Sequence, residues 1–204
     1  MTESFGLFLL SAAGISLSGV MLPGPLTAAT IAKGYHNGNA GIFIALGHGV
    51  VEIPLMAVIY LGFARFFTYP EARIAIGLAG GLMLIFMGAM VVRNLTRSQN
   101  TALDLPYNSL VTGIVMTGAN PYFFIWWATI GIALIATAAG FGILGLAIFA
   151  VVHWSCDLLW EQFISTVVFR TKRLWTRKVE IIVFSICALV LIGFGIWFCV
   201  SVFA

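Results

Sequence analysis

Six long apolar runs restrict this chain to one kind of fold. They cover residues of about 5–31, 41–67, 72–92, 109–139, 141–166 and 179–203, and the connections between them are short and polar. A helix of about 20 apolar residues crosses the hydrocarbon core of a bilayer. Because every backbone polar group in lipid needs an internal partner, such runs fold as helices. We therefore predict an all-α membrane protein with six transmembrane helices.

The composition agrees with this reading. Of the 204 residues, 61% are apolar and 8% are charged, whereas a soluble domain carries about 25% charged residues. We predict one multi-pass transmembrane domain over residues 1–204, in contact with the lipid bilayer of the plasma membrane. The net charge of +3 comes from residues near the ends of the runs, so we expect no nucleic-acid partner.

The basic residues also predict an orientation. Eight of the ten lie in the first, third and fifth connections, beginning with Lys33; the fifth connection alone holds Arg170, Lys172, Arg173, Arg177 and Lys178. Connections rich in Lys and Arg remain on the cytoplasmic side. Both termini are then predicted to lie outside.

The two halves of the chain share one order of features: a broken helix, a helix with a histidine and a carboxylate, and a plain helix. In the first half these features are Pro23-Gly24-Pro25, then His48 with Glu52, then Gly80-Gly81. In the second half they are Asn120-Pro121, then His153 with Asp157, then Gly193 with Gly195. Because three spans are an odd number, the second copy must be inverted. We predict two inverted three-helix repeats, about 5–92 and about 109–203, with helices 1 and 4 broken. Inverted repeats are common in secondary transporters.

The breaks indicate helix starts inside the membrane. Gly24-Pro25 and Asn120-Pro121 each resemble a cap residue followed by proline at the first helical position. The free N–H groups of such a start favour an anion, for example a carboxylate. We therefore predict that substrate binds near Pro23, Gly24, Pro25, Asn120 and Pro121. Simple proline kinks are the alternative.

Ionisable residues occur deep in the second and fifth runs. His48 and Glu52 are four residues apart, as are His153 and Asp157, so each pair shares a helix face. A carboxylate at membrane depth is costly and needs a partner. These four residues are predicted to form a proton relay or a site for a substrate amine. Two alternatives stay open: a structural hydrogen bond, and a site for zinc, nickel or cobalt.

Three further features are weaker. Trp126 and Trp127 follow the second break within two turns and are predicted to line the substrate cavity, with interfacial anchoring as the alternative. Glu161 lies near a helix end and is expected at the membrane interface. Glycines permit close helix contacts, which we expect inside the monomer, with a homodimer as the alternative: Gly47, Gly49, Gly80, Gly81 and Gly88.

The sequence contains none of the motifs that would predict an enzyme or a resident cofactor. It has no His-Glu-x-x-His, no Walker A loop and no Cys-x-x-Cys, the short motifs of zinc, nucleotide and thiol chemistry. We expect neither enzymatic activity nor a cofactor.

Several of these segments resemble the lysine exporter (LysE/RhtB) family of small secondary transporters. The resemblance is carried by Pro23-Gly24-Pro25, by the glycine-spaced stretches 41–49 and 73–82, and by 113–121 with its Asn120-Pro121. Stretches 120–127 and 153–160 are similar to an archaeal branch. The resemblance implies export of amino acids or their derivatives, driven by the membrane potential or a proton gradient. The wider superfamily includes thiol electron carriers, but these need cysteine beside the prolines, where Gly24 and Asn120 stand here.

The sequence therefore predicts a proton-coupled exporter of amino acids or similar small zwitterions. Its expected partners are a small-molecule substrate and protons or another coupling ion. The alternative is a divalent metal-ion exporter that binds its cargo through His48, Glu52, His153 and Asp157.

Overall fold

A computed structural model of the chain describes residues 4–22, 24–62, 69–97, 105–201 and 203, which form helices and turns and contain no strand. The helices are α1 (Phe5–Val20), α2 (Pro25–His36), α3 (Ala40–Tyr60), α4 (Pro70–Arg97), α5 (Ser109–Gly118), α6 (Pro121–Trp126), the π-helix η2 (Trp127–Gly131), α7 (Ile132–Gly140), α8 (Gly142–Thr171), the 3₁₀-helix η3 (Lys172–Leu174) and α9 (Arg177–Ser201). The protein is thus all-α, as the apolar runs predicted.

Several helices are long and apolar enough to cross a membrane. Four of them qualify alone: Ala40–Tyr60, Pro121–Gly140, Gly142–Leu174 and Arg177–Ser201. The pair α1 and α2, bent by 74° at the break, would make a fifth span. The apolar part of α4, Gly77–Arg93, is shorter. A multi-pass membrane protein follows from these helices, whereas six spans arranged as inverted repeats stay a prediction.

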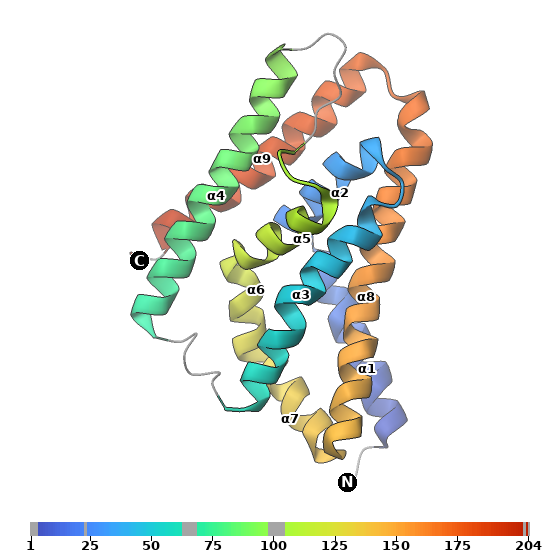
Figure 1. The fold of residues 1–204 in the computed structure, drawn as a ribbon, viewed down its shortest axis with the longest axis vertical. Coiled ribbons are helices and arrows are strands. Elements are labelled where there is room, and N and C mark those ends of the chain that lie inside the picture. Colours follow the sequence, from blue (N-terminus) through green and yellow to red (C-terminus); the bar gives the residue numbers. More distant parts are fainter. Residues whose placement is uncertain (1–3, 23, 63–68, 98–104, 202, 204) are drawn as a thin grey trace.

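The long helices form two groups, α4 with α9 and α3 with α8, and α2, α5 and α6 lie between them (Figure 1). Helix α8 packs along α3 and α1, while α4 pairs closely with α9. Helix α2 contacts both α8 and α9, and α5 packs along α3. Two apolar clusters form the core, one around Met87, Met116 and Phe184 and the other around Phe8, Trp127 and Phe149.

Both predicted helix starts are present. Helix α1 ends at Val20, and α2 begins at Pro25 after Gly24, whose backbone is extended. Helix α6 begins at Pro121 after Asn120, whose side-chain oxygen accepts a hydrogen bond from the Tyr122 N–H at 3.1 Å. Proline suits this first position because its missing N–H would be unpaired there anyway. The remaining predicted break residue, Pro23, lies outside the described residues.

Glycine lets α3 and α5 approach closely. A Cβ atom on Gly113 would lie 2.2 Å from the Ile44 carbonyl oxygen, and one on Gly47 would lie 2.1 Å from the Leu110 oxygen. Between α4 and α9, a Cβ on Gly81 would lie 2.6 Å from the Gly195 oxygen. These glycines pack helices within one chain, as small residues do in membrane proteins. The homodimer stays a prediction.

Two charged residues lie deeper in the protein than the sequence indicated. Lys33, assigned to the first connection, belongs to the last turn of α2 and is 6% exposed. Its ammonium donates to the Leu105 carbonyl oxygen at 2.9 Å. Glu161, expected at the interface, is 1% exposed and accepts a hydrogen bond from the Thr30 hydroxyl. Glu161 is covered because α2 packs against α8, whereas Lys33, on α2 itself, reaches the chain at Leu105.

Candidate functional site

A cavity of about 410 Å³ lies where the two breaks meet the middle of α3 and α8. Its walls contain polar side chains from both halves of the chain and aromatic rings from α6, η2 and α9. The lining includes Ser16, Gly24, Pro25, Thr27, His48, Glu52, Asn120, Phe123, Trp126, Trp127, His153, Asp157, Glu161, Phe194 and Trp197. The cavity is large enough for a small metabolite and is within the size range of ligand sites.

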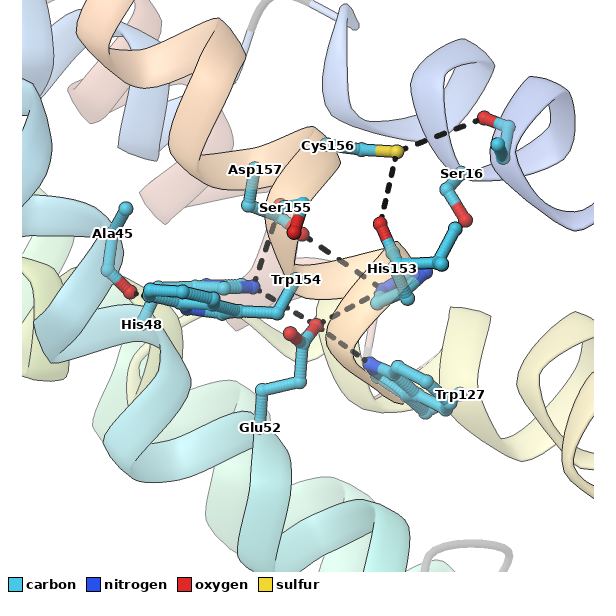
Figure 2. Close-up of polar contacts among 12 residues, drawn as sticks. Ser16, Ala45, His48, Glu52, Trp127, His153, Trp154, Ser155, Cys156 and Asp157 are labelled. Atoms are coloured by element: carbon cyan, nitrogen blue, oxygen red, sulfur yellow. Dashed lines mark hydrogen bonds and ion pairs between the residues drawn. The ribbon is translucent and has the colours of Figure 1, made fainter. Parts of the chain in front are cut away.

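The two histidine–carboxylate pairs meet as one cluster on the cavity wall (Figure 2). Glu52 Oε1 lies 3.0 Å from His48 Nε2 on its own helix and 3.2 Å from His153 Nε2 on α8. Asp157 Oδ1 lies 3.5 Å from His48 Nε2, and its Oδ2 lies 3.9 Å from His153 Nε2. Each carboxylate therefore faces both histidines, one on its own helix and one on the other.

Glu52 is the more fully surrounded of the two acids. Besides the two imidazole nitrogens, its Oε1 accepts a hydrogen bond from the Trp127 indole N–H at 3.3 Å. An indole N–H can only donate, so this oxygen serves as an acceptor. Glu52 is 1% exposed, and charge-assisted hydrogen bonds compensate a buried carboxylate for its lost hydration.

Asp157 is buried as deeply but has weaker partners. It is 4% exposed, and its Oδ2 makes no hydrogen bond with any described residue. Both imidazole distances exceed the usual range for an N–H···O hydrogen bond. A buried polar atom without a partner is rare and suggests a missing ligand, proton or water. Glu52 Oε2 likewise has no hydrogen-bond partner among the described residues, so each carboxylate has one oxygen with capacity to bind a further donor.

The far side of each imidazole ring is held by a hydroxyl. His48 Nδ1 lies 2.8 Å from Thr117 Oγ1, and His153 Nδ1 lies 2.6 Å from Ser16 Oγ. Thr117 and Ser16 are themselves 2% and 0% exposed. Both nitrogens of both rings are therefore in contact with polar atoms.

Tryptophans form the wall beside His153. The Trp126 ring stacks on that imidazole at 5.5 Å between centroids, and the Trp127 ring meets it edge-on at 4.9 Å. Trp127 begins the π-helix η2, and such turns occur frequently at functional sites. A Cβ on Gly131 would lie 2.2 Å from the Trp127 ring, so the glycine makes room for it.

Metal ligation is chemically compatible with part of this cluster. Ligand atoms of His48, Glu52 and Asp157 lie within 4.8 Å of one another. Imidazole with carboxylate suits several first-row transition metals.

The structure brings most of the predicted site residues to one place. His48, Glu52, His153, Asp157, Trp126 and Trp127 line the cavity with Gly24, Pro25 and Asn120. Pro121 begins the adjoining helix but does not belong to the lining. The sequence interpretation missed Ser16, Thr30 and Thr117. The sequence feature that marks these three residues is a hydroxyl side chain inside an apolar run. Such hydroxyls are too common in membrane helices to indicate a site.

The chain is all-α, has several membrane-crossing helices, and has a polar cavity where two of its helices are broken. These features are typical of a small polytopic transporter. The LysE type translocator family model matches residues 17–202, so the chain belongs to this family. No curated protein and no solved structure matched it. The family makes the protein a translocator of amino acids or similar small molecules.

Proposed function

We propose that the protein exports amino acids or similar small zwitterions across the plasma membrane in exchange for protons, with both termini outside. The observation that carries this proposal is the meeting of two histidine–carboxylate pairs with the α2 helix start in one cavity. A zwitterion needs both a cation and an anion site, and this cavity contains groups suited to each.

The substrate carboxylate is assigned to the helix start at Pro25. Gly24 provides no side-chain hydrogen bond to the first N–H groups of α2, and Thr27 in that first turn lines the cavity. At the other start, Asn120 already accepts from the Tyr122 N–H. The α2 start is therefore the better anion site, since its N–H groups have no competing cap.

The substrate ammonium is assigned to Asp157. Asp157 Oδ2 and Glu52 Oε2 both lack a hydrogen-bond partner among the described residues, but Glu52 Oε1 already lies within 3.3 Å of two imidazole nitrogens and the Trp127 N–H. The oxygens of Asp157 lie 3.5 and 3.9 Å from the imidazoles, so Asp157 has fewer close partners to compete with an ammonium. Carboxylate–ammonium contacts in a buried site are among the stronger polar interactions.

Charge balance supports coupling to protons. Two neutral imidazoles with two ionised carboxylates carry a net charge of −2, so the cluster is neutral when it holds two additional protons. Uncompensated charge at membrane depth is costly. An ammonium that arrives beside Asp157 replaces part of this positive charge and favours release of a proton from the cluster.

The test is a thermal-shift panel of amino acids on the purified protein in detergent, repeated with Asp157→Asn and Glu52→Gln. We expect a subset of amino acids to stabilise the wild type, and each substitution to abolish that shift. Glu71→Gln, an exposed carboxylate at the start of α4, is the matched control and should behave as wild type. Normal shifts, followed by normal transport in liposomes, in both cluster variants would refute the proposal.

The second candidate is export of a divalent metal ion as the substrate. It is favoured by the close approach of ligand atoms from His48, Glu52 and Asp157. In the same assay, stabilisation by Zn²⁺, Co²⁺ or Ni²⁺ that disappears in His48→Ala and His153→Ala would support this candidate over the first. If no metal changes the unfolding temperature of the wild type, the candidate fails.

A further inference from the structure

Two buried hydroxyls contact the outer nitrogens of the cluster histidines, and each comes from the opposite half of the chain. Ser16 on α1 reaches His153 on α8, and Thr117 on α5 reaches His48 on α3. Both hydroxyls lie on the helix segment that precedes a break. Neither touches Glu52 or Asp157 in the described structure, so they do not belong to the proton-binding or substrate-binding groups proposed above.

A second contact of each hydroxyl, to a carbonyl oxygen of its own helix, favours one direction of donation. Ser16 Oγ donates to the Ala12 carbonyl oxygen at 2.7 Å, and Thr117 Oγ1 donates to the Gly113 oxygen at 2.8 Å. A hydroxyl has one hydrogen. Helical Ser and Thr hydroxyls commonly donate to the carbonyl four residues earlier; with the hydrogen placed there, the oxygen accepts from the imidazole and the facing Nδ1 carries a proton.

We infer that Ser16 and Thr117 are positioning residues that hold His153 and His48 in the Nδ1–H form, with both Nε2 atoms directed at Glu52. This inference rests on the proposed function, because it specifies which atoms exchange protons at that same site. A neutral imidazole with Nδ1–H has a bare Nε2. Both exchangeable positions then face Glu52 Oε1, at 3.0 and 3.2 Å, and neither faces away from the cavity.

The crosswise arrangement adds a consequence for transport. Separation of α1 from α8, or of α5 from α3, lengthens a hydroxyl–imidazole hydrogen bond. Hydrogen bonds weaken steeply beyond their short range of distances. Movement of α1 away from α8 therefore weakens the hydrogen bond that positions His153, and movement of α5 away from α3 weakens the one that positions His48.

The test is ¹⁵N NMR of the full chain labelled at histidine and reconstituted in liposomes without added substrate. The chain has three histidines, and His36→Gln leaves the two cluster rings. We expect a protonated, pyrrole-type Nδ1 on both. Ser16→Ala should remove this uniform state from His153, and Thr117→Val, which keeps the shape but not the hydroxyl, should remove it from His48.

The controls separate positioning from folding. Thr117→Ser retains the hydroxyl and should restore the wild-type spectrum of His48. The unfolding temperature of each variant reports whether it folds. If Thr117→Val does not fold, the wild-type spectrum and the Ser16→Ala spectrum still test the inference. A bare, pyridine-type Nδ1 on either ring of the wild type would overturn the inference, as would unchanged spectra in both hydroxyl-deleted variants. The spectra are recorded without a ligand, so failure of this inference can be distinguished from failure of the amino-acid thermal-shift panel that tests the proposed function.

Discussion

Substitution of Gly113 by alanine tests how closely α5 must approach α3 for the site to form. The added Cβ would lie 2.2 Å from the Ile44 carbonyl oxygen, whereas ordinary contact begins at 3.4 Å. The helices must therefore separate by about 1.2 Å. Thr117 lies one turn further along α5, so its oxygen would move from 2.8 Å to as much as about 4 Å from His48 Nδ1, beyond hydrogen-bonding range.

The expected cost in stability is about 1–3 kcal/mol, as for other overpacked interiors. For a protein of this size that corresponds to a fall of roughly 2–12 °C in the unfolding temperature, measured by tryptophan fluorescence in detergent. Gly118→Ala on the same helix is the matched control, because its Cβ meets nothing within 4 Å. If Gly113→Ala unfolds at the same temperature as this control, the close approach does not constrain the fold and the reasoning is refuted.

Two further substitutions on α2 test the polar contacts of Glu161 and Lys33, the two charged residues that the sequence placed too near the surface. Thr30→Val removes the hydroxyl that donates to Glu161 and should cost about 1–3 kcal/mol, whereas Thr30→Ser should retain most of the stability; equal unfolding temperatures for the two would contradict this. Lys33→Met removes the donor to the Leu105 carbonyl and should lower the unfolding temperature by a comparable amount, while exposed Lys178→Met should have little effect. If both lysine variants behave alike, the buried contact adds nothing.

The combined cluster places Glu52 and Asp157 in different surroundings despite their matched positions in sequence. Each follows a histidine by four residues, and each is almost fully buried. Each has one oxygen without a hydrogen-bond partner among the described residues, but Glu52 Oε1 lies within 3.3 Å of both imidazoles and the Trp127 N–H, whereas the Asp157 oxygens lie 3.5 and 3.9 Å from the imidazoles. This difference in hydrogen bonding is the reason that we assign the substrate ammonium to Asp157.

The sequence by itself determined the class of fold and the positions of the helix breaks. Long apolar runs exclude a soluble globule, because the bilayer is the only solvent that accepts so much apolar surface. The starts at Pro25 and Pro121 were predictable, because proline acts on its own backbone and needs no distant partner. Spacing by four placed each histidine beside its own carboxylate for the same local reason.

The tertiary structure alone decided how these local features combine. Glu52 and His153 are 101 residues apart, yet they come within 3.2 Å, and the spacing of one helix says nothing about its neighbour. Ser16 and Thr117 acquire their roles from helices in the other half of the chain. Glu161 is buried because α2 packs over it, and Lys33, on α2, is buried with its ammonium against the Leu105 carbonyl. These arrangements depend on how helices pack, which follows from shape complementarity over many residues rather than from any short motif.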